Sequence, residues 1–192
     1  MVKQKKLPSS EQLKEELKRV KNRDRYKKAF RGTIWTLVVV AAASIILSTF
    51  LFSVLKTQGT SMEPVLADGQ LVIAVKTNYF ESGDVIAFYY NNKVLIKRVI
   101  GHAGDWVDIA ENGDVTVNEV LLDEPYVVDK ALGDGDVTYP YQVPENRWFV
   151  LGDHRATSTD SRNSIIGNVS KEQVIGKVVL RIWPLSQISS IK

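Results

Sequence analysis

An uninterrupted apolar run, residues 34–55, constrains this chain more than any other feature. Its 22 residues include no Asp, Glu, Lys or Arg. About 20 apolar helical residues suffice to cross the roughly 30 Å hydrocarbon layer of a bilayer. The few polar side chains in the run, those of Thr36, Ser44, Ser48 and Thr49 among them, can bond back to helix carbonyls. The sequence therefore predicts one transmembrane helix over residues 34–55.

A buried core helix and a cleaved signal peptide are the alternative interpretations of this run. The apolar region of a signal peptide is only about 7 to 15 residues long, and residues 51–60 lack an A-x-A cleavage pattern. A membrane-spanning helix agrees better with both observations.

The charged residues are distributed unevenly along the chain. Residues 1–33 carry 12 Lys and Arg against 4 Asp and Glu, a net of +8, whereas residues 34–192 carry 13 against 18, a net of −5. Basic flanks of membrane helices stay in the cytoplasm. We therefore expect a single-pass protein of the plasma membrane with residues 1–33 cytoplasmic and residues 56–192 extracytoplasmic. Within residues 9–28 acidic residues alternate with basic ones, which favours a solvated helix beside anionic lipid over a nucleic-acid-binding tail.

The part after the apolar run has the pattern of a β domain. Short β-branched segments are separated by Gly, Asn and Asp turns, which predicts a mainly β fold of small, strongly bent sheets. Residues 122–146 are acidic and rich in Gly and Pro, so we interpret them as a surface excursion between core strands. The candidate strands are residues 71–75, 84–90, 94–100, 106–110, 115–117, 148–151 and 174–182.

Three segments of this domain could carry chemistry. Ser61 lies in a turn bracketed by Gly59 and Pro64, with the apolar side chains of Met62 and Leu66 beside it. A serine in a turn is by itself an ordinary turn residue, and it becomes a nucleophile only when a base lies beside it. Cysteine is absent from the sequence, which excludes disulfides, thiol nucleophiles and Cys-ligated zinc.

The second segment, residues 94–100, places two adjacent cations on a strand. Alternation along the strand puts Lys97 and Arg98 on opposite faces, so one of them meets an apolar surface. If that residue is Lys97, burial lowers the pKa of its ammonium group and lets it accept a proton at neutral pH. The alternative is an edge strand with two solvated cations.

The third segment is the polar loop of residues 152–162. Together the motifs Ser61-Met62-Glu63-Pro64, residues 83–88, residues 97–101 with Gly104-Asp105, and this loop follow one apolar span in a fixed order. In these motifs the chain resembles bacterial type I signal peptidases of the Gram-positive type, which belong to the S26 family. The resemblance extends from the apolar span almost to the C-terminus.

The resemblance implies a membrane-bound serine endopeptidase that removes N-terminal signal peptides from exported preproteins. It implies that Ser61 attacks the scissile carbonyl, that neutral Lys97 is the general base, and that Ser158 orients Lys97. Supporting charges are then expected from the same loop, at Asp153, Arg155, Asp160 and Arg162.

The resemblance also implies substrates with small side chains at the first and third positions before the cut. The expected pocket-wall residues are Met62, Val85, Ile86, Ala87 and Phe88. A Ser-Lys pair supplies both nucleophile and base, so neither a metal nor an organic cofactor is expected. The expected partners are preproteins and the lipid membrane, with no nucleic acid; the sequence does not indicate an oligomeric state.

The chain departs from the commonest family pattern at several positions. His154 follows Gly152-Asp153 where Asn is frequent, and His102-Ala103 precedes Gly104 where Pro is frequent at the second position. Gly59 stands where some relatives place a second hydroxyl donor for the oxyanion, which leaves the Ser61 N–H as the expected donor. Neither histidine has a metal-ligand spacing.

Other functions remain as alternatives. The same dyad could serve a specialised peptidase with few substrates or a soluble self-cleaving repressor, although a repressor would carry a DNA-binding module instead of the apolar span. An inactive relative acting as a membrane assembly chaperone would require neither Ser61 nor Lys97.

Overall fold

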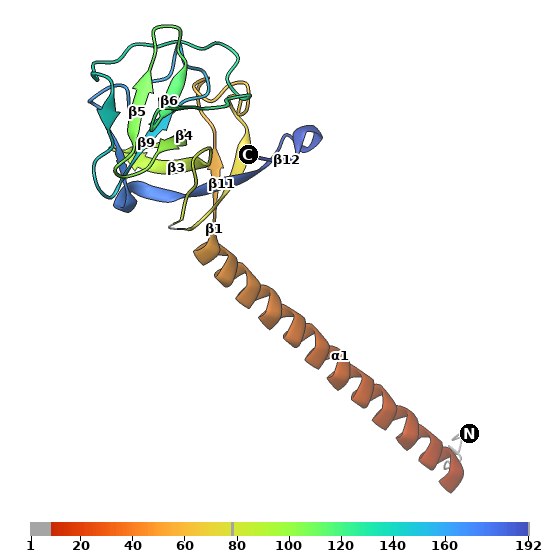
Figure 1. Ribbon diagram of the computed structural model, residues 1–192. Helices are drawn as coiled ribbons and strands as arrows, with labels where there is room; N and C mark the ends of the chain where they lie inside the picture. The colour runs from red at the N-terminus through yellow and green to blue at the C-terminus, as the bar shows by residue number, and fades with distance from the viewer. Residues whose placement is uncertain (1–8, 78, 192) are drawn as a thin grey trace. The chain divides into compact units, whose positions relative to one another are not determined.

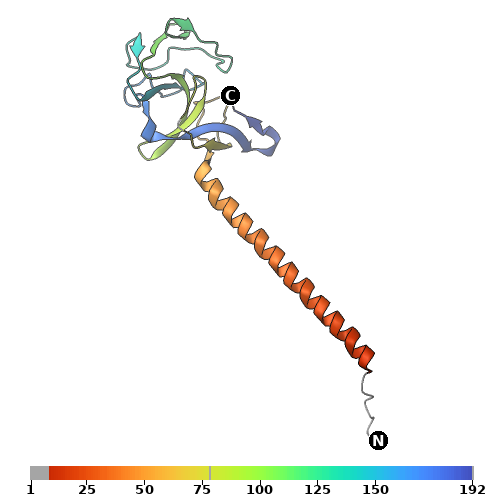
Figure 2. The same ribbon diagram turned by 60° about the horizontal axis from the view of Figure 1, so that its bottom comes forward.

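The computed structural model describes residues 9–77 and 79–191. These residues form one long helix followed by antiparallel sheets (Figure 1, Figure 2), so the predicted mainly β class with one N-terminal helix is confirmed. The chain divides into two compact units, Met1–Thr49 and Phe50–Lys192. The first eight residues of the predicted cytoplasmic segment lie outside the described residues.

Helix α1 spans Ser10–Leu51. It begins with a reciprocal cap, because the Gln12 N–H donates to Ser9 Oγ (3.4 Å) while the Ser9 N–H donates to Gln12 Oε1 (3.1 Å). None of the helix residues is buried within the described structure, and α1 is long and apolar enough to cross a membrane, judged by length and composition. Hydroxyls bond back to carbonyls three or four residues earlier at Thr33, Thr36, Ser44, Ser48 and Thr49.

The helix ends before the boundary predicted at residue 55. Strand β1 (Phe52–Lys56) follows directly and pairs antiparallel with β2 (Leu71–Val75), and Leu55 packs against a core cluster. The last residues of the predicted span are therefore strand. Aromatic and β-branched residues suit a strand as well as a membrane helix, so the apolar pattern does not show where one gives way to the other.

Two antiparallel sheets build the second unit. The larger has the order β1-β2-β11-β3-β4-β9-β10, with β12 paired to β11, and the smaller has the order β7-β6-β5-β8. The seven strands predicted from the sequence all form, each within one residue at either end. The remaining bounds are β3 Val85–Tyr90, β4 Lys93–Gly101, β5 Trp106–Ile109, β6 Val115–Val117, β7 Val120–Leu121, β8 Tyr141–Gln142, β9 Arg147–Leu151, β10 Val169–Ser170, β11 Val174–Trp183 and β12 Ser189–Ser190, with short helical turns η1 Lys171–Gln173 and η2 Leu185–Gln187.

Strand β3 is the centre of the core. It lies between β11 and β4, and its alternating side chains enter two different clusters. Val85 and Ala87 pack in one cluster with Met62, whereas Ile86 and Phe88 pack in another. A third cluster, which includes residues of β4, β5, β6 and β9, fills the space between the two sheets.

The segment 122–146 is more integrated than the predicted surface excursion. Most of its residues are exposed, but Glu124 and Val143 are buried, and the segment contributes β8, which pairs with β5. A single buried carboxylate and a two-residue strand produce no periodic pattern in the sequence, so neither could be predicted from it.

Candidate active site

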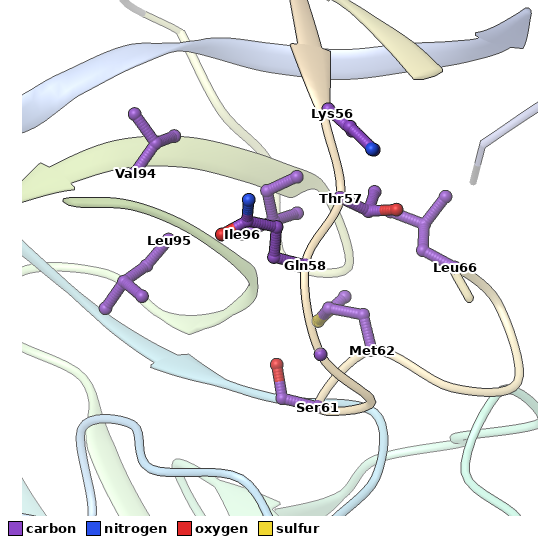
Figure 3. Close-up of a pocket in the computed structure, with 10 residues that line it drawn as sticks. Lys56, Thr57, Gln58, Ser61, Met62, Leu66, Val94, Leu95 and Ile96 are labelled. Carbon is purple, nitrogen blue, oxygen red and sulfur yellow. The ribbon is translucent and has the colours of Figure 1, made fainter. Parts of the chain in front are cut away.

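Ser61 lies on a turn that is fixed on both sides. Gly59 has a positive φ of 81°, and its N–H donates to Asp68 Oδ1 (2.7 Å). Beyond the serine, the Leu66 N–H donates to the Met62 carbonyl (2.8 Å), and both of these apolar side chains are buried. Ser61 itself stays partly exposed, and Figure 3 shows its side chain beside Met62.

Lys97 and Arg98, adjacent on β4, are both buried, with 3% and 1% of their surfaces exposed. The sequence predicted that one of them would be buried. Arg98 is neutralised by Asp153, to which its Nε and Nη2 donate at 2.8 and 2.7 Å. Lys97 Nζ instead donates to Ser158 Oγ (2.9 Å), and among the described residues no carboxylate forms a salt bridge with it. The two cations therefore differ in how their charge is balanced.

This difference determines the electrostatics of the lysine. Burial lowers the pKa of Lys97 from 10.5 to about 8, because the ammonium form loses hydration without gaining a paired anion. The charges of Asp160 and Asp153 raise the pKa of Lys97 and the charge of Arg162 lowers it, but all three effects are smaller than that of burial. Near neutral pH, Lys97 can therefore lose its proton and act as a base.

Gly152 is the point at which the polar loop meets the serine turn. A side chain at this position would overlap both Ser158 Oγ and the Ser61 carbonyl oxygen, so these two atoms lie against the same backbone position. The Ser61 carbonyl also accepts a hydrogen bond from the His154 N–H (3.1 Å). Through Ser158, the loop therefore brings Lys97 and the serine turn to one site.

The charged residues of the loop hold its backbone in place. Asp160 accepts from Arg162 Nε (2.8 Å) and from the Gly152 N–H (3.0 Å). Arg155 Nε donates to the Gly152 carbonyl (3.1 Å). Its guanidinium is paired with Glu124, a residue outside the four sequence motifs. Each of these groups is buried, so their hydrogen bonds are sheltered from water.

A small pocket of about 50 Å³ opens beside Ser61. One side is formed by residues 56–59 with Ser61, Met62 and Leu66, and the other by Val94, Leu95 and Ile96 of β4 (Figure 3). A volume of this size suits small side chains.

Only Met62 of the predicted pocket-wall residues lines this pocket. Val85, Ile86, Ala87 and Phe88 are at most 2% exposed, because β3 is covered by neighbouring strands and its side chains fill the core. The wall is provided instead by the adjacent strand β4, whose side chains at residues 94–96 are less buried. Strand β3 therefore contributes no side chain to the lining of this pocket.

The two histidines make local contacts. His102 Nε2 lies 2.9 Å from the Phe80 carbonyl oxygen, and His154 Nδ1 lies 2.8 Å from Thr157 Oγ1. Across residues 9–77 and 79–191, no group of three or more His, Asp or Glu side chains could hold a metal ion.

Comparison with known proteins identifies the family of this chain. The model of the family "Signal peptidase, peptidase S26" matches residues 30–183. The chain belongs to this family. Family membership makes it a serine-type peptidase, and it confirms the resemblance found in the motifs.

Individual relatives in the signal peptidase family match over most of their length. Signal peptidase I of Bacillus caldolyticus is 37% identical over 180 residues, covering 85% of this chain and 97% of the relative. Signal peptidase IB of Staphylococcus aureus is 34% identical over 181 residues, covering 84% and 93%. A crystal structure of a signal peptidase I from Enterococcus faecalis aligns with a TM-score of 0.44 and 30% identity, covering 52% of this chain and 96% of that one.

Proposed function

We propose that this signal peptidase cleaves N-terminal signal peptides from preproteins with Ser61 as nucleophile and Lys97 as general base. The observation that carries the assignment of the base is the environment of Lys97, a buried amine that bonds to Ser158 and has a pKa of about 8. Arg98 is equally buried, but it is paired with Asp153, and guanidinium groups do not serve as bases in proteins. Lys97 is therefore the better base of the two.

The reaction proceeds in two steps. Neutral Lys97 Nζ takes the Ser61 hydroxyl proton while Oγ bonds to the scissile carbonyl carbon, and the Ser61 N–H stabilises the oxyanion. The C–N bond then breaks, and the Lys97 ammonium gives its proton to the departing amine. Water attacks the resulting ester, Lys97 takes a proton from it, and the acid leaves as Ser61 regains its hydrogen. Ser158 Oγ holds the lysine throughout.

The pocket suits the residues that precede the cut. Met62 and Leu66 are among the residues that line it, and its volume of about 50 Å³ suits a small apolar side chain such as that of alanine. Among the described residues, residues 94–96 of β4 pair with β3 on one side only, because β9 pairs with β4 from Arg98 onward. An extended substrate backbone could add to this free edge.

The membrane arrangement follows from the charge distribution. The basic residues before the apolar run favour an N-terminus in the cytoplasm and a catalytic unit outside it. Ser61 follows the end of α1 by ten residues, so a membrane-embedded signal peptide and the serine would share one surface. Tethering both to the bilayer raises their effective concentration.

Cleavage of a preprotein with an Ala-x-Ala site tests the dyad. The detergent-solubilised wild type should release mature protein, whereas Ser61→Ala and Lys97→Ala should not, with circular dichroism confirming that both are folded. Normal cleavage by either folded variant would exclude the mechanism, and an inactive wild type would favour a chaperone. A panel of unrelated preproteins separates a general from a specialised peptidase, and recovery in the membrane fraction excludes a soluble repressor.

A further inference from the structure

Glu124 is a buried carboxylate outside the motifs that identified the active site. Only 6% of its surface is exposed. It accepts two hydrogen bonds from Arg155, at 3.2 Å from Nη1 and 2.5 Å from Nη2, and one from the Tyr126 hydroxyl at 3.1 Å. The carboxylate therefore has three donors, and two of them come from the loop that contacts the serine turn.

Arg155 connects Glu124 to that loop's backbone. While its terminal nitrogens bind Glu124, its Nε donates to the Gly152 carbonyl (3.1 Å). The Gly152 N–H in turn donates to the carboxylate of Asp160 (3.0 Å). The backbone at Gly152 is thus fixed at both ends, directly beneath Ser158 Oγ and the Ser61 carbonyl.

Tyr126 connects the same carboxylate to the strand that carries the base. The Arg98 guanidinium carbon lies 3.8 Å from the centre of the Tyr126 ring, a distance typical of a cation–π contact. Arg98 directly precedes Val99 and follows Lys97 on β4. Burial raises the pKa of Tyr126, so its hydroxyl keeps the proton that it donates to Glu124.

We propose that Glu124 is a positioning residue that holds Ser158 and Lys97 in register with Ser61, through Arg155 on one side and through Tyr126 and Arg98 on the other. The inference rests on the proposed dyad function. A buried ion pair adds little net stability, because desolvation offsets its Coulomb attraction. The geometric role of Glu124 therefore accounts better for a buried charge at this position than a contribution to stability does.

The test replaces Glu124 by its neutral isostere in the full-length, detergent-solubilised protein. For Glu124→Gln we expect kcat on an Ala-x-Ala peptide to fall by about 10- to 100-fold, as small misplacements of reacting groups cause, while KM changes less than about threefold. The matched control is Glu145→Gln, the same substitution at an exposed position in the same segment, which should leave both constants unchanged. Wild-type cleavage that is abolished by Ser61→Ala and by Lys97→Ala establishes the dyad independently.

Two readouts separate positioning from general destabilisation. The pH midpoint of kcat/KM should shift in Glu124→Gln in the same direction as in Ser158→Ala. In the double variant Glu124→Gln/Ser158→Ala, the midpoint should shift no further than in Ser158→Ala. If Glu124 acts through Arg155, then Glu124→Gln and Arg155→Gln should be non-additive in kcat. Wild-type kcat and pH midpoint in folded Glu124→Gln would overturn the proposal.

A variant that fails to fold also has a definite interpretation. Removing Glu124 alone leaves the Arg155 charge buried and unpaired, whereas removing both charges avoids that penalty. If Glu124→Gln does not fold, the double variant Glu124→Gln/Arg155→Gln is measured instead. Reduced kcat with a displaced pH midpoint in that variant supports positioning, and wild-type kinetics contradict it.

Discussion

The pair Lys97 and Arg98 shows how one residue can be made reactive beside a neighbour that is inert. Both side chains are buried, but Asp153 compensates Arg98 with a bidentate ion pair, whereas Lys97 has the Ser158 hydroxyl. A buried ammonium without a paired anion opposes folding. The reactivity of Lys97 is therefore obtained at the expense of stability.

Replacing Lys97 by methionine should stabilise the protein below about pH 8. Below that pH, Lys97 is charged in both the folded and unfolded states, so the folded state bears the full cost of desolvating the ammonium group. Between the folded value of about 8 and the reference value of 10.5, the unfolded state binds more protons, and wild-type stability rises with pH. We expect the free energy of unfolding of Lys97→Met to exceed that of the wild type by up to about 3 kcal/mol at pH 7. This difference should disappear by about pH 11.

Urea unfolding of both proteins across this pH range measures the difference. A destabilised Lys97→Met at pH 7, or a difference independent of pH, would contradict the desolvated-ammonium account.

Cleavage should depend on pH through the same lysine. Because only neutral Lys97 accepts the serine proton, kcat/KM should increase about tenfold per pH unit below the pKa of about 8 and level off above it. Initial rates on a peptide without ionisable groups near the cut give the profile. A midpoint near pH 10 would show that burial does not lower the pKa of Lys97 in solution.

Gly152 should tolerate no side chain. Because a β-carbon there would overlap Ser158 Oγ and the Ser61 carbonyl, Gly152→Ala should lower kcat/KM by about 100-fold or more even if the domain folds. Peptide cleavage together with circular dichroism tests this, with Thr159→Ala, an exposed change in the same loop, as control. Unchanged cleavage by Gly152→Ala would mean that the loop can move away without cost.

Strands β3 and β4 have different roles in the fold. β3 fills the core with both of its faces, while residues 94–96 of β4 line the pocket beside Ser61. Substitutions in the two strands should therefore have different consequences.

Phe88→Leu in β3 should lower stability by about 1 kcal/mol through lost packing, and leave the preference for small side chains before the cut unchanged. Ile96→Ala in β4 should instead widen the pocket and admit larger side chains. Cleavage of a peptide series with Ala, Val and Leu before the cut, combined with urea unfolding, distinguishes the two effects. If Phe88→Leu changed the preference for the side chain before the cut, β3 would contribute to the pocket wall after all.

The sequence predicted those elements whose pattern repeats over several residues. Seven of the eight strands longer than two residues could be recognised from alternation and turn residues. The exception is β1, which continues the apolar run and was predicted as part of the membrane helix. The two-residue strands β7, β8, β10 and β12 are too short to alternate, and they depend on partners distant in sequence. Glu124 was missed because a lone carboxylate in an acidic segment resembles a solvated one until its partner, Arg155, is known.

The chain divides into two compact units that differ in how their side chains are buried. The helix has no buried residues in the described structure, whereas the β unit contains three core clusters of its own. The stability of the β unit should therefore not require the helix.

A chain beginning at Phe50 should fold and cleave a short soluble peptide within about threefold of the full-length rate. Its cleavage of a preprotein in lipid vesicles should fall by about 100-fold or more, because the tether no longer concentrates enzyme and substrate on one surface. Parallel assays on the two substrates, with circular dichroism of the shortened chain, measure both effects. Equal losses on both substrates would show that the helix supports the catalytic unit itself.

The free edge of β4 has a consequence beyond substrate binding. Unpaired backbone groups along a strand are a template for any extended chain, and exposed edges are where proteins associate into larger aggregates. Charged lysines are a common protection, since two copies docking edge to edge would bring like charges together. Lys93 stands exposed at the start of β4, and Lys56 stands exposed across the pocket. These cations could therefore keep concentrated catalytic units from pairing with one another while leaving the edge open to a preprotein.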